Sequence, residues 1–242
     1  MINRVFPSLS DYENLSRLRV ESSEFANDFD YNEIVVNKPW GYEYLWYQSE
    51  TVAIWFLKIT KGKSTSLHCH AKKRTSLVVL KGLATCSTIN DKFNLAPLDC
   101  IVLEPCVFHT SAAITEDIYL LEIETPPMKG DLVRMHDNYG REGSGYEKAN
   151  DYSRDLDKFE FHPYDRHTIA PWIYGDIQID LFDKTSLMNK VYSLIIPVND
   201  YEKLVTGQIV EIGESSNFKH EEIEQNEDRN NRYFVFSLFS ES

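Results

Sequence analysis

The feature that most constrains this chain is a series of short runs of β-branched and aromatic residues between residues 38 and 125. Turn-forming residues separate the runs, among them Gly82 and the pair Asn90 and Asp91, which has the length of a tight hairpin turn. Many short strands at this spacing predict an all-β sandwich or barrel. The expected strands cover residues 42–47, 52–60, 76–81, 84–89, 100–103 and 118–123.

The rest of the chain divides around this region. Residues 126–165 are polar, carry few strand signals and predict a long loop with some helix. Strand-like runs then return at residues 176–182, 191–198, 204–212 and 233–239, with a solvated loop at 221–232. They predict either a second, smaller β unit or extra strands on the first. We therefore expect an N-terminal extension (1–37), a barrel (38–142), a linker (143–170) and a C-terminal β-rich region (171–242).

The N-terminal extension is acidic and weakly patterned. Ser10 and Glu13 have the spacing of a capping box, which predicts a helix that begins near Asp11. This helix would form an appendage to the barrel.

Charge and cysteine content exclude several classes of function. The 242 residues contain 25 Lys and Arg against 38 Asp and Glu, so the formal net charge is −13. A field of this sign repels phosphates, which argues against sequence-independent binding of nucleic acids or anionic membranes. No apolar run is long enough to span a membrane, and the N-terminus lacks the apolar segment of a signal peptide. We therefore expect a cytoplasmic protein whose four cysteines, none of them in a CxxC pair, are reduced thiols.

Three histidines have the arrangement of a metal site. His68 and His70 are two residues apart in strand-like sequence, so their side chains point to the same face of a strand. His109 stands at the end of another expected strand, and the interior of a small barrel would bring the three imidazoles together. Such a site accepts one divalent metal, namely zinc, iron, nickel or manganese. An HxH pair in a β protein is also often incidental, so the pair by itself does not decide the question.

The residues around these histidines resemble the two sequence motifs of the cupin superfamily. The first motif places an HxH pair between two glycines, which are Gly62 and Gly82 here. In the second motif His109 is retained, whereas Leu98 and Cys106 replace glycines. The resemblance implies a cupin barrel, also called a double-stranded β-helix or jelly roll. This barrel would carry the N-terminal helical appendage and the additional C-terminal strands.

Two further segments resemble the cupin domain of type II mannose-6-phosphate isomerases. KPWGYEY at residues 38–44 is similar to the motif that opens that domain, and DLVRMHDNYGRE at residues 131–142 is similar to the motif that closes it. The resemblance implies metal-dependent isomerisation of a sugar phosphate. Two ligand positions differ from the family, because His68 replaces a glutamine and Thr75 replaces a glutamate. The loss of a charged donor at Thr75 implies weak or altered isomerase activity, and a glutamate there should tighten the metal.

Polar residues near these motifs are candidates for catalysis and substrate binding. A base for isomerisation is expected at Glu122, unless its strand turns this side chain outward, or at Glu104 near the barrel mouth. Arg141 would polarise or clamp a sugar oxygen, or else form an ion pair with Asp137 or Glu142. The expected substrate-binding residues are Lys38, Lys72, Lys73, Arg74 and Tyr139. The basic residues at 72–74 would bind a substrate phosphate, unless they form an ordinary solvated loop. Tyr139 would line the site or belong to the core.

Three functions are compatible with these features. The first is a metal-dependent enzyme acting on a sugar phosphate or nucleotide sugar, most like mannose-6-phosphate isomerase, in polysaccharide precursor metabolism. The second is a three-histidine Fe(II) dioxygenase acting on a small molecule, and the third is a non-catalytic carbohydrate-binding or regulatory cupin. The fold does not choose among them, whereas metal identity and oxygen consumption would. The resemblance to cupins also implies a homodimer formed through edge strands.

Overall fold

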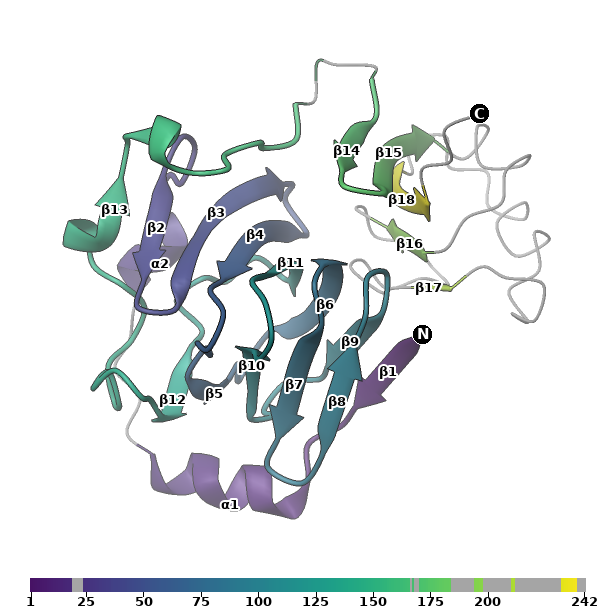
Figure 1. Ribbon diagram of the computed structural model, residues 1–242. Coiled ribbons are helices and arrows are strands. Elements are labelled where there is room, and N and C mark those ends of the chain that lie inside the picture. Colours follow the sequence, from purple (N-terminus) through teal and green to yellow (C-terminus); the bar gives the residue numbers. More distant parts are fainter. Residues whose placement is uncertain are drawn as a thin grey trace.

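The larger sheet of the molecule has eight strands (Figure 1). The structure is a computed structural model that describes residues 1–18, 24–165, 167, 170–183, 194–197, 210–211 and 232–238. The strand order in this sheet is β1 (Ile2–Val5), β9 (Cys100–Leu103), β6 (Arg74–Lys81), β11 (Ile118–Thr125), β4 (Ala53–Ile59), β3 (Gly41–Gln48), β2 (Val35–Lys38) and β13 (Tyr152–Ser153). β1 pairs with β9 in parallel, and the remaining pairs are antiparallel.

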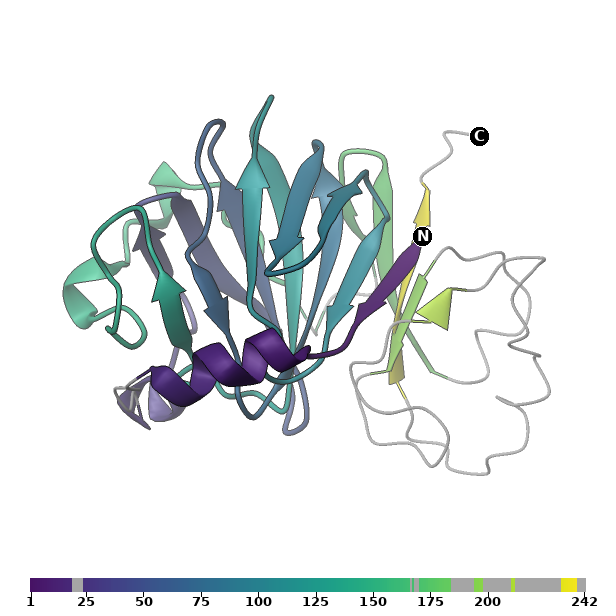
Figure 2. The same cartoon turned by 90° about the horizontal axis from the view of Figure 1, so that it is seen from below.

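A second sheet of five strands faces the first, and the two curve around a shared interior (Figures 1 and 2). The hairpin predicted at Asn90 and Asp91 is confirmed, because these residues join two antiparallel strands of this sheet. The all-β barrel predicted from the sequence is therefore confirmed. The strand order is β12 (Val133–His136), β5 (Leu67–Cys69), β10 (His109–Ala113), β7 (Ala84–Thr88) and β8 (Lys92–Leu95).

The larger sheet is buried on both faces, because side chains alternate along each strand. Along β4, Trp55 and Leu57 belong to the core inside the barrel, whereas Phe56 belongs to a second core on the outer side. A third sheet covers this outer side and contributes Phe234 and Phe236 to the second core. Additional C-terminal strands are thus present, as the sequence predicts, and pack on the barrel. Their order is β14 (Trp172–Tyr174), β15 (Ile177–Asp183), β18 (Arg232–Leu238), β16 (Leu194–Pro197) and β17 (Val210–Glu211). Most of the strand predicted at 204–212 and of the loop predicted at 221–232 lies outside the described residues.

The first helix begins earlier than the sequence predicts. α1 (Leu9–Arg17) starts two residues before Asp11, and its capping box joins Ser8 to Asp11 instead of Ser10 to Glu13. The reason is a tertiary contact, since the buried Asp11 also accepts a hydrogen bond from the backbone N–H of Phe108 at 2.9 Å. The other helical segments of the described chain are α2 (Glu24–Asp28) and two 3₁₀ turns, η1 (Ala149–Asp151) and η2 (Leu156–Lys158). Among the described residues, no helix has both the length and the apolar character required to cross a membrane.

Candidate metal centre

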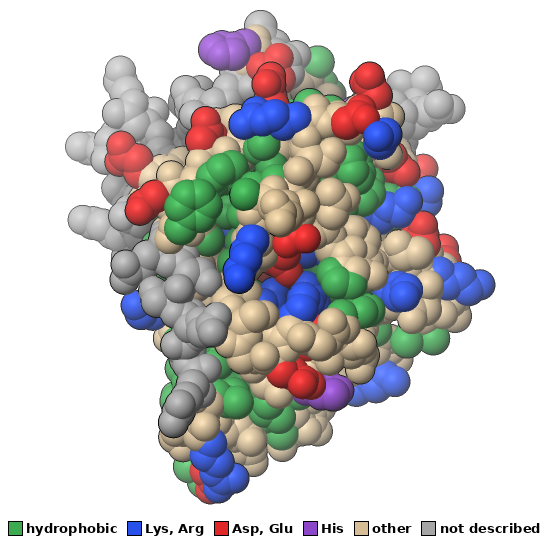
Figure 3. All heavy atoms as spheres, turned by 90° about the vertical axis from the view of Figure 1, so that its left-hand side faces the viewer, with side chains coloured by type: hydrophobic (Ala, Val, Ile, Leu, Met, Phe, Trp, Pro, Cys, Tyr) green, Lys and Arg blue, Asp and Glu red, His purple; other side chains and the backbone are tan. Residues whose placement is uncertain are grey.

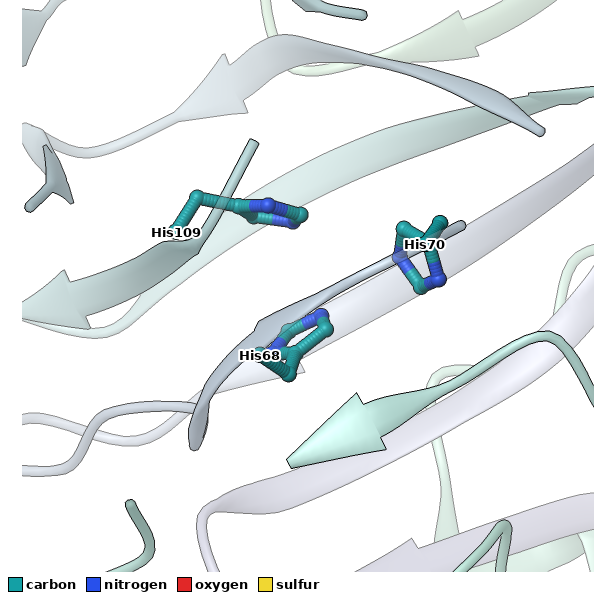
Figure 4. A group of neighbouring side chains, drawn as sticks. All are labelled: His68, His70 and His109. Atoms are coloured by element: carbon teal, nitrogen blue, oxygen red, sulfur yellow. The ribbon is translucent and has the colours of Figure 1, made fainter. Parts of the chain in front are cut away.

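Three histidines from two neighbouring strands converge inside the barrel (Figure 4). His68 lies in β5, His70 follows the end of that strand, and His109 opens β10 directly opposite His68. The ring centroids are 4.5 Å apart for His68 and His109, 5.1 Å for His68 and His70, and 5.5 Å for His70 and His109. One ligand nitrogen from each ring lies within 4.8 Å of the others. Cys69, between the first two histidines, packs on the opposite side with Phe108 and Val133.

Main-chain carbonyls fix the orientation of all three rings. The Nδ1 atoms lie 2.8 Å from the carbonyl oxygen of Ser66 for His68, 2.5 Å from that of Asp131 for His70, and 3.0 Å from that of Val107 for His109. A carbonyl oxygen only accepts hydrogen bonds, so each Nδ1 carries the proton and each Nε2 keeps a free lone pair. Nε2 of His70 is buried and has no hydrogen-bond partner among the described residues. Three anchored imidazoles with free Nε2 atoms fit a divalent metal.

Burial keeps these histidines neutral. The pKa of His68 and the pKa of His70 are well below the usual 6.5, and burial is the largest cause for both. Burial likewise lowers the pKa of His109 to about 4, although its hydrogen bond to Val107 acts in the opposite direction. Neutral imidazole is the form that binds a metal, so the centre is ready for a metal at neutral pH.

A carboxylate lies beside the histidines. Glu122 projects inward from the middle of β11, and its Oε1 is 3.7 Å from Nε2 of His70. Burial raises the pKa of Glu122 above 4.5, although the charge of Lys129 lowers it in part. The residue is 7% exposed, so this acid is held in the cavity next to the nitrogen that would face the metal. A buried carboxyl at this position is placed to exchange a proton with a group bound in the cavity.

Two buried lysines and two more carboxylates continue the polar interior. Nζ of Lys73 lies 2.8 Å from Oε1 of Glu124, and Nζ of Lys129 lies 3.3 Å from the same oxygen and 3.0 Å from Oε1 of Glu43. Lys129 also lies over the ring of Trp55, with Nζ 3.7 Å from the centroid. Burial alone would raise the pKa of Glu43 and of Glu124, but the neighbouring lysine charges lower both. The pKa of Glu43 falls to about 2. Both carboxylates are therefore ionised and paired.

The polar interior extends toward one face of the molecule. Lys38 pairs with Glu43 at 3.2 Å and with Glu147, and Arg134 from β12 pairs with Glu147 at 2.8 Å. The hydroxyl of Tyr146 donates to Glu43. On the face drawn in Figure 3, acidic and basic side chains meet in a hollow. Lys38, Glu43, Arg134 and Tyr146 line the same cavity as the three histidines.

Asp131 holds the segment that follows the HxH pair. Its carbonyl accepts the bond from His70, and its carboxylate accepts from the backbone N–H groups of Ala71, Lys72 and Lys73 at 3.1, 2.7 and 2.9 Å. One residue thus sets both the ring of His70 and the turn that directs Lys73 inward.

The structure separates the predicted site residues into two groups. His68, His70, His109, Lys38, Lys73 and Glu122 line one cavity. The other predicted site residues do not line it. Lys72 is exposed, and Arg74 pairs with Glu104 at 3.0 Å. Arg141 pairs with Asp137 at 2.8 Å and with Glu147 at 2.6 Å, and the hydroxyl of Tyr139 donates to the carbonyl of Ser64 at 3.1 Å. Arg141 therefore has the ion pair with Asp137 that was the alternative to a substrate contact.

Several lining residues were not predicted from the sequence. Glu43, Lys129, Arg134 and Tyr146 line the cavity together with Glu124, which the sequence places on the same face as Glu122. Glu43 falls within the KPWGYEY segment, so that motif was a usable signal. Arg134 likewise falls within the DLVRMHDNYGRE segment, whereas Lys129 and Tyr146 fall in parts of the predicted polar loop that give no local sign of burial.

No protein-family model matches the chain, and no curated protein matches it. Among solved structures, KdgF from Halomonas sp. is 18% identical, with a TM-score of 0.36, over 38% of this chain and 84% of that one. Oxalate decarboxylase from Lactobacillus farciminis is 19% identical, with a TM-score of 0.39, over 44% of this chain and 35% of that one. A cupin 2 conserved barrel domain protein from Rhodopseudomonas palustris is 15% identical, with a TM-score of 0.33, over 35% of this chain and 59% of that one. The last two matches cover less than two thirds of the proteins concerned. The arrangement of two facing sheets, antiparallel except for the β1–β9 pair, is the cupin barrel that the sequence predicts, and it encloses the histidine cluster.

Proposed function

We propose that this chain is a metal-dependent enzyme that interconverts the aldose and ketose forms of a small sugar or sugar phosphate. The observation that carries the proposal is the position of Glu122, whose Oε1 lies 3.7 Å from Nε2 of His70. Isomerisation needs a base that moves a proton between neighbouring carbons and a group that polarises the carbonyl. The cavity offers the base and a ligand set for the polarising group side by side.

The roles of the residues follow from their chemistry. His68, His70 and His109 would hold one divalent metal through Nε2, and such a metal supplies Lewis-acid polarisation of substrate oxygens. Glu122 would take a proton from the carbon next to the carbonyl and return it to the former carbonyl carbon. The hydroxyl proton moves to the former carbonyl oxygen, so no atom is gained or lost. The apolar walls, including Leu57 and Leu77, keep bulk water from the transferred proton.

The proposal is tested by loading the protein with zinc, iron, manganese or nickel and assaying mannose 6-phosphate and related aldoses in a coupled isomerase assay. Glu122→Gln keeps the size of the side chain and removes the base. We expect kcat to fall by about 100-fold or more while the bound metal is retained. Glu116→Gln on the surface is the matched control and should keep the wild-type rate.

Glu104→Gln separates the two bases expected from the sequence. Activity that survives Glu122→Gln and is lost in Glu104→Gln would refute the assignment made here. A wild-type protein that binds no metal in any of the four forms would refute the metal centre itself.

A second candidate is an Fe(II) dioxygenase, and the ligand set favours it. The cluster contributes three histidines, and Thr75 stands where a glutamate ligand occurs in the resembled family. Oxygen consumption that depends on iron and on an added small molecule, with no isomerase activity, would support this candidate. Sugar binding by a metal-free protein without turnover would support the non-catalytic alternative.

A further inference from the structure

Among the fully buried side-chain atoms of the described residues that have no hydrogen-bond partner is a carboxylate oxygen of Glu124. Glu124 is 1% exposed, and its Oε1 receives the lysine contacts described above. Its Oε2 makes no hydrogen bond with any described residue. A buried carboxylate oxygen left unpaired costs free energy, so this atom marks a position where a hydrogen-bond donor belongs.

Lys73 has free donors at the same position. An ammonium group has three N–H donors, and the structure records one partner for Nζ of Lys73, which is Oε1 of Glu124 at 2.8 Å. The side chain is 1% exposed, so solvent does not readily satisfy the remaining donors. Both groups line the cavity that contains the three histidines.

We propose that Glu124 Oε2 and Lys73 Nζ together bind one hydroxyl group of a polyhydroxylated, carbohydrate-type substrate. A hydroxyl donates one hydrogen bond and accepts others, so it satisfies the carboxylate oxygen and the ammonium at once. Both bonds involve a charged partner, which makes them stronger than bonds between neutral groups. This inference rests on the proposed function, because it names the group by which the same cavity would recognise a sugar.

The chemistry of the pair argues against an anion at this position. A phosphate presents acceptor oxygens and negative charge, which the unpaired oxygen of Glu124 would repel. The sequence predicts a phosphate site at Lys72, Lys73 and Arg74, but Lys72 is exposed and Arg74 is paired with Glu104 outside the cavity. Lys73 is the member of that run that lines the cavity, and it lies beside a carboxylate.

The test is calorimetric titration of the full chain, metal-free and zinc-loaded, with D-mannose, D-glucose and D-galactose. The tightest-binding sugar is then compared with its monodeoxy analogues. We expect one analogue to bind about tenfold more weakly or worse, because it lacks the hydroxyl that contacts the charged pair. In Glu124→Gln this difference between the sugar and that analogue should shrink to less than about threefold. Lys92→Met, on the exposed part of β8, is the control and should keep the full difference.

Each remaining outcome has a defined meaning. The inference is overturned if the loss of affinity from the sugar to each deoxy analogue is as large in Glu124→Gln as in the wild type, or if no sugar binds. In either case Glu124 and Lys73 bind only water. Inorganic phosphate that competes with the sugar, and ceases to compete in Lys73→Met, would overturn the inference in favour of an anion site. Lys73→Met, with the same sugar series, replaces Glu124→Gln as the test if the latter does not fold. Zinc titration of every variant separates this inference from the proposed function, because the pair could bind a sugar in a protein that never binds a metal.

Discussion

At the scale of single residues, the lowered pKa of each histidine determines how the centre responds to pH. Protons compete with a metal for Nε2 only near or below the pKa of the ring. For His109 that value is about 4, compared with 6.5 for an ordinary histidine, and the other two rings shift in the same direction. We therefore expect zinc affinity to change little between pH 7 and about pH 5. Zinc titrations across this range, with circular dichroism to monitor folding, would measure it. An affinity that drops steeply below pH 6.5 would contradict the prediction.

Thr75 gives a second prediction at this scale. The sequence suggests that a glutamate here would tighten the metal, but Thr75 lies opposite Glu124 in the β6–β11 pairing and is 1% exposed. A second carboxylate facing Glu124 would be buried beside a like charge, where Lys73 and Lys129 already pair with Glu124, so Thr75→Glu should destabilise the fold by about 3 kcal/mol or more. Thr75→Val removes a buried hydroxyl that has no recorded partner and should leave stability unchanged or raise it. Urea denaturation of both variants compares them. A Thr75→Glu protein as stable as wild type, with tighter zinc binding, would restore the expectation from the sequence.

At the scale of elements, α1 supports the strand that carries His109. Asp11 closes the capping box of its own helix, because its Oδ2 accepts a hydrogen bond from the backbone nitrogen of Ser8 at 2.7 Å. Its Oδ1 accepts a hydrogen bond from the backbone N–H of Phe108, the residue before His109. Asp11→Ala removes the cap and leaves a buried N–H unpaired, so we expect a loss of about 2 kcal/mol in unfolding free energy. The same variant should bind zinc more weakly, because the support of His109 is lost. Glu13→Ala, on the exposed side of the helix, should change neither quantity by much. Unchanged zinc affinity in Asp11→Ala would show that α1 does not position the centre.

At the scale of the whole molecule, the large sheet separates an inner core from an outer core. The inner core surrounds the metal centre, and the outer core joins the barrel to the C-terminal sheet through residues such as Phe234 and Trp46. Phe234→Ala should lower the unfolding free energy by about 3–5 kcal/mol, because the side chain is fully buried. It should leave the zinc stoichiometry unchanged, since the side chain packs on the opposite face from the histidines. Ser237→Ala, on the same strand, is the control. Loss of zinc in a Phe234→Ala protein that is still folded would show that the two cores are coupled.

Local sequence patterns determined most of the barrel and the core of its metal centre. Strand positions follow from runs of β-branched and aromatic residues between turn residues, and these patterns are read without knowledge of distant contacts. The two-residue spacing places His68 and His70 on one face for a purely local reason. The prediction that His109 stands at the end of a strand is wrong, because His109 opens β10, and nothing in its own neighbourhood indicates that it will lie opposite His68.

The tertiary structure decided what surrounds the histidines. β12 is four residues long within a polar stretch, and its pairing with β5 brings Arg134 into the cavity. Lys129 and Glu43 are charged residues that local patterns assign to the surface. They are buried because they pair with each other and with further charged residues, Glu124 for Lys129 and Lys38 for Glu43. The same reasoning explains why Lys73 and Arg74, adjacent in sequence, have different environments. A buried charge is stable only with its partner, and that partner comes from a distant part of the chain, so the sequence alone could not show it.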